Sequence, residues 1–223
     1  MNILYTTLWI SIFLQVLIGI LNLVVLINPI HPSFTLIRHL LFGEFAVQVV
    51  EASFYVYWAS HFSTIENITP KRYLDWMLTT PTMLITLMLY SIYLGYKETN
   101  KDASTLKALD LLQEHWMTIS QVVILNAAML VCGYLGEIHK LPVTVSVGLG
   151  FIPFFIMYAI IYHTFSIQSR EGILIFYYFL FFWSLYGIAA LCSYTVKNTM
   201  YNVLDIFAKN FFGFFLMYVI YYS

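Results

Sequence analysis

The chain has 223 residues, of which 61% are hydrophobic and 9% are charged, and its mean hydropathy is +0.81. Ordinary soluble domains carry about 25% charged residues, so this composition excludes a soluble globular protein and predicts a membrane protein. The formal net charge of −1 gives no indication of nucleic-acid binding. Cys132 and Cys192 fall inside apolar segments without metal-ligand spacing, so neither a metal site nor a disulfide framework is expected.

Seven apolar segments are each long enough to cross a bilayer, which requires about 20 residues. Lipid leaves only helices or closed barrels to satisfy backbone polar groups. The predicted fold is therefore an all-α membrane protein, a seven-transmembrane-helix bundle forming one domain over residues 1–223. The predicted helices cover residues 3–27, 35–60, 72–95, 104–135, 143–168, 171–195 and 199–222.

Lysine and arginine residues between the predicted helices favour one orientation slightly. With the N-terminus outside and the C-terminus cytoplasmic, five of them lie in the inner connections and four in the outer ones. The chain is therefore expected to be a multi-pass integral membrane protein in that orientation. The inner set is Arg38, Lys97, Lys101, Lys107 and Arg170, and the outer set is Lys71, Arg72, Lys140 and Lys197.

The first two predicted helices carry polar residues that do not suit a lipid-facing position. Ser11, Gln15 and Asn22 share one face of the first helix, which indicates interhelical hydrogen bonds or contact with water. Glu44 and Glu51 are seven residues apart on the second helix and so also share a face. They are either protonated structural glutamates or part of a cation pathway, because rows of carboxylates line such pathways.

The third and fourth predicted helices contain further polar positions. Arg72, Asp75 and Thr79 follow one face, so a cation, a carboxylate and a hydroxyl lie in a row. Gln121 and Asn126 on the fourth helix are, by themselves, consistent with ordinary packing.

The last predicted helix places Lys209 in the middle of an apolar segment, with Asp205 one turn before it on the same face. Two interpretations remain open from this helix alone. The pair is a structural ion pair that fixes the helix to its neighbours. Alternatively, the buried lysine forms a Schiff base with a carbonyl compound, and a carboxylate nearby would keep that imine charged and accept its proton.

Two motifs together resemble those of microbial (type 1) rhodopsins: Arg72-Tyr73-x-Asp75-Trp76-x-x-Thr79-Thr80-Pro81, and Asp205-x-x-x-Lys209 on the seventh helix. The resemblance covers the whole chain and implies a light-responsive protein rather than an enzyme. It implies all-trans retinal bound covalently to Lys209 as a protonated Schiff base. Asp75 and Asp205 would then be the counterions, and Arg72 would organise the waters between them.

The resemblance also implies a retinal pocket. Trp76 and Trp183 would enclose the polyene, and Tyr186 would hydrogen-bond to Asp205. Thr80 and Asn126 would couple the third and fourth helices. The remaining expected retinal contacts are Met129 and Gly133 on the fourth helix, with Phe154, Phe155 and Tyr158 as ring contacts on the fifth.

The sequence departs from the family pattern at several positions. Thr86 stands where the proton pumps of the family usually have a carboxylate donor, and the short link at 193–198 lacks their outer glutamate pair. Gly187 and Ala190 replace a proline and a tryptophan of the sixth helix. The departures put the ring end of the pocket, and proton pumping by the usual route, in doubt.

The small size and the polar residues of the first two helices are most similar to the viral rhodopsins of giant algal viruses. Group 1 of these resembles light-gated cation channels, and group 2 resembles outward proton pumps with a glutamate donor on the second helix. The chain is identified as most similar to group 1, because Glu51 falls at the central-gate position of algal cation channels. The implied ion pathway comprises Ser11, Gln15, Glu44, Glu51, Thr79, Asn198 and Asn202 with Asp75.

Two other functions remain open at this point. An outward proton pump would use Asp75 as acceptor and Glu44 as donor. A sensory photoreceptor would signal to a partner protein. The expected partners are retinal, the lipid bilayer and monovalent cations or protons, with a homo-oligomer left open.

Overall fold

A computed structural model describes residues 2–222 as a helical bundle. Seven of its helical segments are long and apolar enough to cross a membrane, in agreement with the predicted fold. The elements are α1 (Ile3–Ile27), η1 (Pro32–Phe34), α2 (Thr35–Ser60), α3 (Thr69–Glu98), η2 (Ala103–Thr105), α4 (Ala108–Glu114), α5 (Trp116–Glu137), α6 (Val143–Thr164), η3 (Ser166–Gln168), α7 (Arg170–Ala190), α8 (Tyr194–Asp205), η4 (Ile206–Asn210) and α9 (Phe211–Tyr222).

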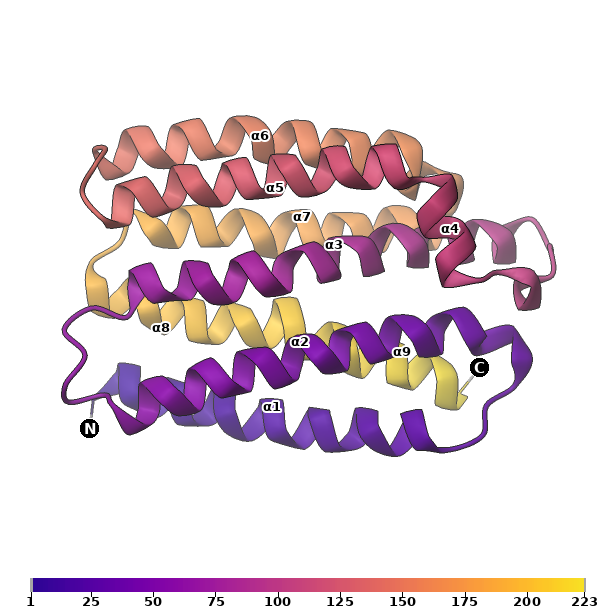
Figure 1. The fold of residues 1–223 in the computed structure, drawn as a ribbon, viewed down its shortest axis with the longest axis horizontal. Helices are drawn as coiled ribbons and strands as arrows, with labels where there is room; N and C mark the ends of the chain where they lie inside the picture. The colour runs from indigo at the N-terminus through magenta and orange to yellow at the C-terminus, as the bar shows by residue number, and fades with distance from the viewer. Residues whose placement is uncertain (1, 223) are drawn as a thin grey trace.

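The helices form two groups around α3 (Figure 1). Helices α5, α6 and α7 lie on one side, and α1, α2 and the α8–η4–α9 segment lie on the other. The two chain ends lie at opposite ends of the bundle, as seven crossings require (Figure 1). We call the end that holds Asn2 the N-side and the end that holds Tyr222 the C-side.

The predicted helix boundaries were wrong most clearly in two places. The range 104–135 contains a short α4 and a separate α5, because the backbone of His115 (φ −104°, ψ 13°) departs from helical geometry between them. The predicted link at 193–198 is largely the first turns of α8. Helix α7 ends at Ala190, and the extended backbone of Ser193 (ψ 155°) precedes the new helix.

The seventh span contains a π-helical segment, η4, that includes Lys209. A π-bulge disturbs the regular backbone hydrogen bonds of a helix and is frequent at functional sites. Tyr178 on α7 donates its hydroxyl to the backbone carbonyl of Phe207 at 2.7 Å, which satisfies an acceptor inside this segment. The bulge is therefore supported by a side chain from a neighbouring helix.

A buried ion pair joins α5 to α8 on the N-side. Lys197 Nζ lies 2.7 Å from Glu137 Oε1, and the two residues are only 8% and 7% exposed. Removing one partner of such a pair leaves an uncompensated buried charge, whereas replacing both with apolar groups is often neutral.

We therefore expect Lys197→Met to destabilise the protein by about 3 kcal/mol and to lower the temperature at which it unfolds. The double variant Lys197→Met/Glu137→Met should recover most of this loss. The measurement is the thermal loss of the circular-dichroism signal in detergent, with the exposed Lys140→Met as control. Equal behaviour of the single variant and its control would contradict the prediction.

Candidate functional site

Lys209 lies at the centre of a cluster of buried carboxylates. Its Nζ atom is 2.9 Å from Asp75 Oδ2, 3.4 Å from Glu51 Oε1 and 3.6 Å from Asp205 Oδ1. The lysine is 2% exposed and the three carboxylates are fully buried. The structure thus brings Asp75 of the α3 motif and both charged residues of the Asp205–Lys209 motif together with a glutamate from α2.

Charge balance constrains this cluster. Arg72 Nη1 lies 3.6 Å from Asp205 Oδ2. The cluster therefore contains two cations, Arg72 and Lys209, and three carboxylates. An electrically neutral cluster must therefore hold one additional proton, because an unbalanced buried charge is costly. Oxygen atoms of the three acids also lie within 4.8 Å of one another, as in a metal site, but Lys209 Nζ supplies the positive charge among them.

Two tyrosines hold Asp205 in place. Tyr186 donates its hydroxyl to Asp205 Oδ1 at 2.7 Å, the hydrogen bond that the sequence resemblance implied. Tyr55 on α2 donates to the other carboxylate oxygen, and it accepts from Arg72 Nη1 at 3.0 Å. Tyr55 was missed in the sequence analysis. Its signal is its spacing, because it lies four residues after Glu51 and so shares the polar face of α2.

Arg72 is held by two asparagines of α8. Its Nε atom donates to Asn198 Oδ1 at 2.9 Å, and its Nη2 atom donates to Asn202 Oδ1. Ser11 on α1 donates its hydroxyl to the backbone carbonyl of Asn202 at 2.8 Å. The guanidinium also lies 4.8 Å from the centre of the Trp58 ring. Three predicted pathway residues therefore form a closed network around Arg72 on the N-side.

The other predicted pathway residues are also buried, but fewer of their polar atoms have hydrogen-bond partners on other helices. Thr79 donates its hydroxyl to the backbone carbonyl of Asp75 at 2.9 Å, so it is bonded within its own helix. Within residues 2–222, the side-chain amide of Gln15 and both carboxylate oxygens of Glu44 have no hydrogen-bond partner. Thr86, at the usual donor position, donates to the carbonyl of Thr82 at 3.0 Å.

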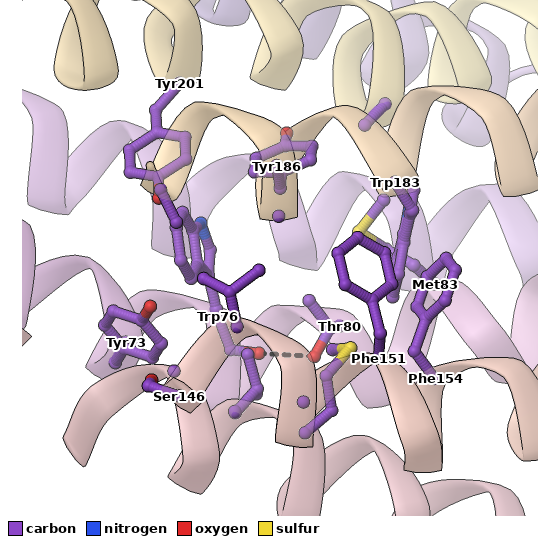
Figure 2. A pocket seen from close by; sticks show the side chains of 18 of the residues that line it. Tyr73, Trp76, Thr80, Met83, Ser146, Phe151, Phe154, Trp183, Tyr186 and Tyr201 are labelled. Carbon is purple, nitrogen blue, oxygen red and sulfur yellow. Dashed lines mark hydrogen bonds between the residues drawn. The ribbon is translucent and has the colours of Figure 1, made fainter. Parts of the chain in front are cut away.

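An apolar pocket lies between α3, α5, α6 and α7 (Figure 2). Lys209 is one of its lining residues. Trp76 and Trp183 both line it. Asn126 Nδ2 donates to Thr80 Oγ1 at 2.8 Å and so connects α5 to α3 beside the pocket. The other lining residues from the predicted set are Thr80, Met129, Gly133, Phe154 and Tyr186. The pocket is completed by Tyr73, Met83, Leu130, Ser146, Val147, Gly150, Phe151, Gly187, Ala190, Tyr201 and Ala208.

The pocket contains both positions at which the sixth spanning helix departs from the family pattern. Gly187 and Ala190 line the pocket, and Phe151 from α6 packs against Gly187. A β-carbon at Gly187 would lie 2.6 Å from Phe151 Cζ, so any larger residue at position 187 would require the Phe151 ring to move. Phe155 was predicted as a ring contact and is wrong, because it is 57% exposed.

The pocket suits a long apolar molecule with one reactive carbonyl. Its walls are aromatic and aliphatic, which suits a polyene, and the amine of Lys209 in its lining can react with an aldehyde. Phe154 lines the wall, whereas the predicted contact Tyr158 is fully buried behind it, with its ring centre 6.2 Å from that of Trp183. The residues present therefore fit retinal.

Comparisons with known proteins agree with this geometry. A family model described as "Bacteriorhodopsin-like protein" matches residues 2–222. The crystal structure of viral rhodopsin OLPVRII superposes with a TM-score of 0.81 at 25% identity, covering 97% of this chain and 96% of that chain.

Two more distant structures share the fold. Thermophilic rhodopsin from Rubrobacter xylanophilus gives a TM-score of 0.76 at 18% identity, over 99% of this chain and 96% of that chain. The light-driven proton pump CsR from Coccomyxa subellipsoidea gives a TM-score of 0.72 at 17% identity, over 97% of this chain and 96% of that chain. A search of curated proteins gave no match. Members of the bacteriorhodopsin-like family are light-driven transporters and channels rather than enzymes. Since the family model covers nearly the whole chain, the chain belongs to this family and is a retinal-binding, seven-span microbial rhodopsin.

Proposed function

We propose that this rhodopsin is a light-gated channel for monovalent cations, with all-trans retinal attached to Lys209. The observation that carries the proposal is the position of Glu51. Its carboxylate lies 3.4 Å from Lys209 Nζ, on the α2 side and away from the retinal pocket. The lysine that would carry retinal is thereby next to a set of buried polar side chains between α1, α2 and the seventh span. We call this set the polar row; its members are Ser11, Gln15, Asn22, Glu44, Gln48, Glu51, Asn198 and Asn202.

Retinal bound at Lys209 supplies the light-driven isomerisation that moves the lysine nitrogen. Asp75 accepts a hydrogen bond from that nitrogen at 2.9 Å and is placed to take its proton. Transfer of this proton removes the charge that holds Glu51, Asp75 and Asp205 around one atom. The side chains then separate, and water enters between α1, α2 and α8.

The polar row gives a cation a path from one end of the bundle to the other. On the N-side, the network of Arg72 with Asn198 and Asn202 closes the path before illumination. Glu51 and Gln15 lie at the middle of the path, and Glu44 lies towards the C-side. Buried carboxylates and amides replace hydration water around a cation, as they do in selectivity filters. We place the N-side outward, on the slight excess of basic residues at the C-side.

The test is voltage-clamp recording with ion substitution, in cells that express the protein and receive retinal. The reversal potential should follow the Na⁺ or K⁺ gradient, with a shift approaching about 59 mV per tenfold change, the Nernst factor for a monovalent ion. Currents that stay outward at every voltage, or that follow only pH, would contradict the channel. Lys209→Ala is the control and should give no photocurrent.

A second function, an outward proton pump, is favoured by Glu44. The carboxyl group is fully buried, and neither oxygen has a hydrogen-bond partner among the residues that the structure describes. It lies on the C-side of Lys209, where it could replace the donor missing at Thr86. A pump predicts light-driven acidification of unbuffered cell suspensions, and Glu44→Gln would slow recovery of the ground state.

A further inference from the structure

A pair of amides, Asn22 and Gln48, lies in the polar row and has no role in the site described above. Asn22 Nδ2 donates to Gln48 Oε1 at 3.3 Å and so joins α1 to α2. Asn22 is fully buried and Gln48 is 2% exposed. Gln48 falls three residues before Glu51 and four after Glu44 on the same face of α2. Along the helix axis it is about 4.5 Å from the level of Glu51 and about 6 Å from that of Glu44.

This pair does not behave as simple packing between helices. Asn22 Oδ1 and Gln48 Nε2 remain without a hydrogen-bond partner within the described range 2–222. Buried polar groups are normally paired, because an unpaired group loses its hydration without compensation. An amide pair that served only to join α1 and α2 would be expected to satisfy both groups. The free oxygen and the free N–H are instead available to water or to an ion.

The seventh span closes tightly over the same pair. A β-carbon at Gly213 of α9 would lie 2.8 Å from Asn22 Nδ2 and closer still to Gln48 Nε2. On α1, a β-carbon at Gly19 would lie 3.6 Å from Gln48 Oε1, which is ordinary contact. The amides are therefore confined between three helices, and a side chain at position 213 would displace them.

We propose that Asn22 and Gln48 form the inner constriction of the pathway, where their amide oxygens replace part of the water shell of a passing monovalent cation. The inference rests on the proposed channel function and adds the place at which ions are discriminated. Neutral amides suit this place, because their dipoles stabilise a cation while the absence of a fixed charge lets it leave. Glu51 on one side and Glu44 on the other hold the cation near the pair.

The test compares amide removal here with the same change elsewhere. Asn22→Leu/Gln48→Leu removes both partners together, so no polar group is newly unpaired. The matched control is Gln121→Leu on α5, where the amide is exposed on the surface of the bundle. Visible absorbance with retinal reports folding. Photocurrent size and the Na⁺-to-K⁺ permeability ratio, from reversal potentials with one cation on each side, report the constriction.

We expect the double variant to retain the absorbance and to lose photocurrent about tenfold, the factor that corresponds to about 1.4 kcal/mol. Its permeability ratio should move towards one, whereas Gln121→Leu should match the wild type. A double variant with wild-type current and wild-type ratio would show that the amides only pack the helices. A wild-type protein that passes no Na⁺ or K⁺ would overturn the channel itself, before any variant is measured.

Two further variants keep the test decisive if the double variant fails to bind retinal. Gln48→Glu preserves the shape of the side chain and adds a negative charge, so Ca²⁺ permeability relative to Na⁺ should rise severalfold. Gly213→Ala displaces both amides and should lower the current, whereas Gly148→Ala, on α6 with open space around it, should not. Unchanged Ca²⁺ permeability together with unchanged current in Gly213→Ala would overturn the proposal.

Discussion

Lys209→Ala is expected to abolish the visible absorbance that the purified protein develops with all-trans retinal. Within residues 2–222, Lys209 is the only lysine that lines the apolar pocket. Alanine has no amine, so no covalent bond to an aldehyde can form at this position. The measurement is the absorption spectrum after retinal is added, and the loss should be complete.

Two further variants separate chemistry from folding in this experiment. Lys209→Arg keeps a positive charge among Asp75, Asp205 and Glu51, so the cluster stays balanced, but a guanidinium is not deprotonated in proteins and cannot form the imine. It should therefore fold without visible absorbance. Lys140→Met alters an exposed lysine outside the site and should still bind retinal. Absorbance in both Lys209 variants would remove this lysine from the site.

The position of buried polar side chains could be predicted from helical spacing alone. Ser11, Gln15 and Asn22 share a face in the sequence, and all three are buried in the bundle. The same holds for Glu44 and Glu51. Helical spacing predicts burial here because a polar side chain in a membrane helix is costly in contact with lipid. Polar residues that share one helix face therefore point into the bundle.

The partners of those side chains could not be predicted in the same way. Arg72 lies three residues from Asp75, which suggested a row on one face, yet its hydrogen bonds reach Asn198, Asn202 and Tyr55 on other helices. Such partners depend on helix rotation, which a pattern within one helix does not contain. Tyr55 was missed because an aromatic residue in an apolar segment is typical of an ordinary hydrophobic core. Its partners Arg72 and Asp205 lie on other helices.

The π-helical segment could not be predicted from the sequence either. Residues 199–222 read as one regular helix, because the apolar pattern contains no proline and only one glycine. The irregular turn at Ile206–Asn210 is supported by the Tyr178 hydroxyl on α7, a tertiary contact. Local sequence cannot predict a backbone change whose compensation comes from another helix. This change matters for the site, since Lys209 lies inside it.

Asp75→Asn is expected to slow proton loss from the Lys209 nitrogen after a light flash by about 100-fold, the lower part of the range for a positioned proton acceptor. Asparagine preserves the shape of the side chain but cannot take up the proton. If opening requires this transfer, the photocurrent should fall by a similar factor, which separates a proton-controlled gate from one driven by retinal shape alone.

Flash absorption spectroscopy and current recording on the same variant measure both steps of this prediction. Asp110→Asn on α4 is the matched control, because its carboxylate is exposed and lies outside the carboxylate cluster. Glu51→Gln provides the decisive comparison. Glu51 is also near Lys209 Nζ, at 3.4 Å against 2.9 Å for Asp75, so it is the alternative acceptor. If proton loss stays fast in Asp75→Asn but is slow in Glu51→Gln, Glu51 on α2 is the proton acceptor. The same residue would then act as both gate and acceptor.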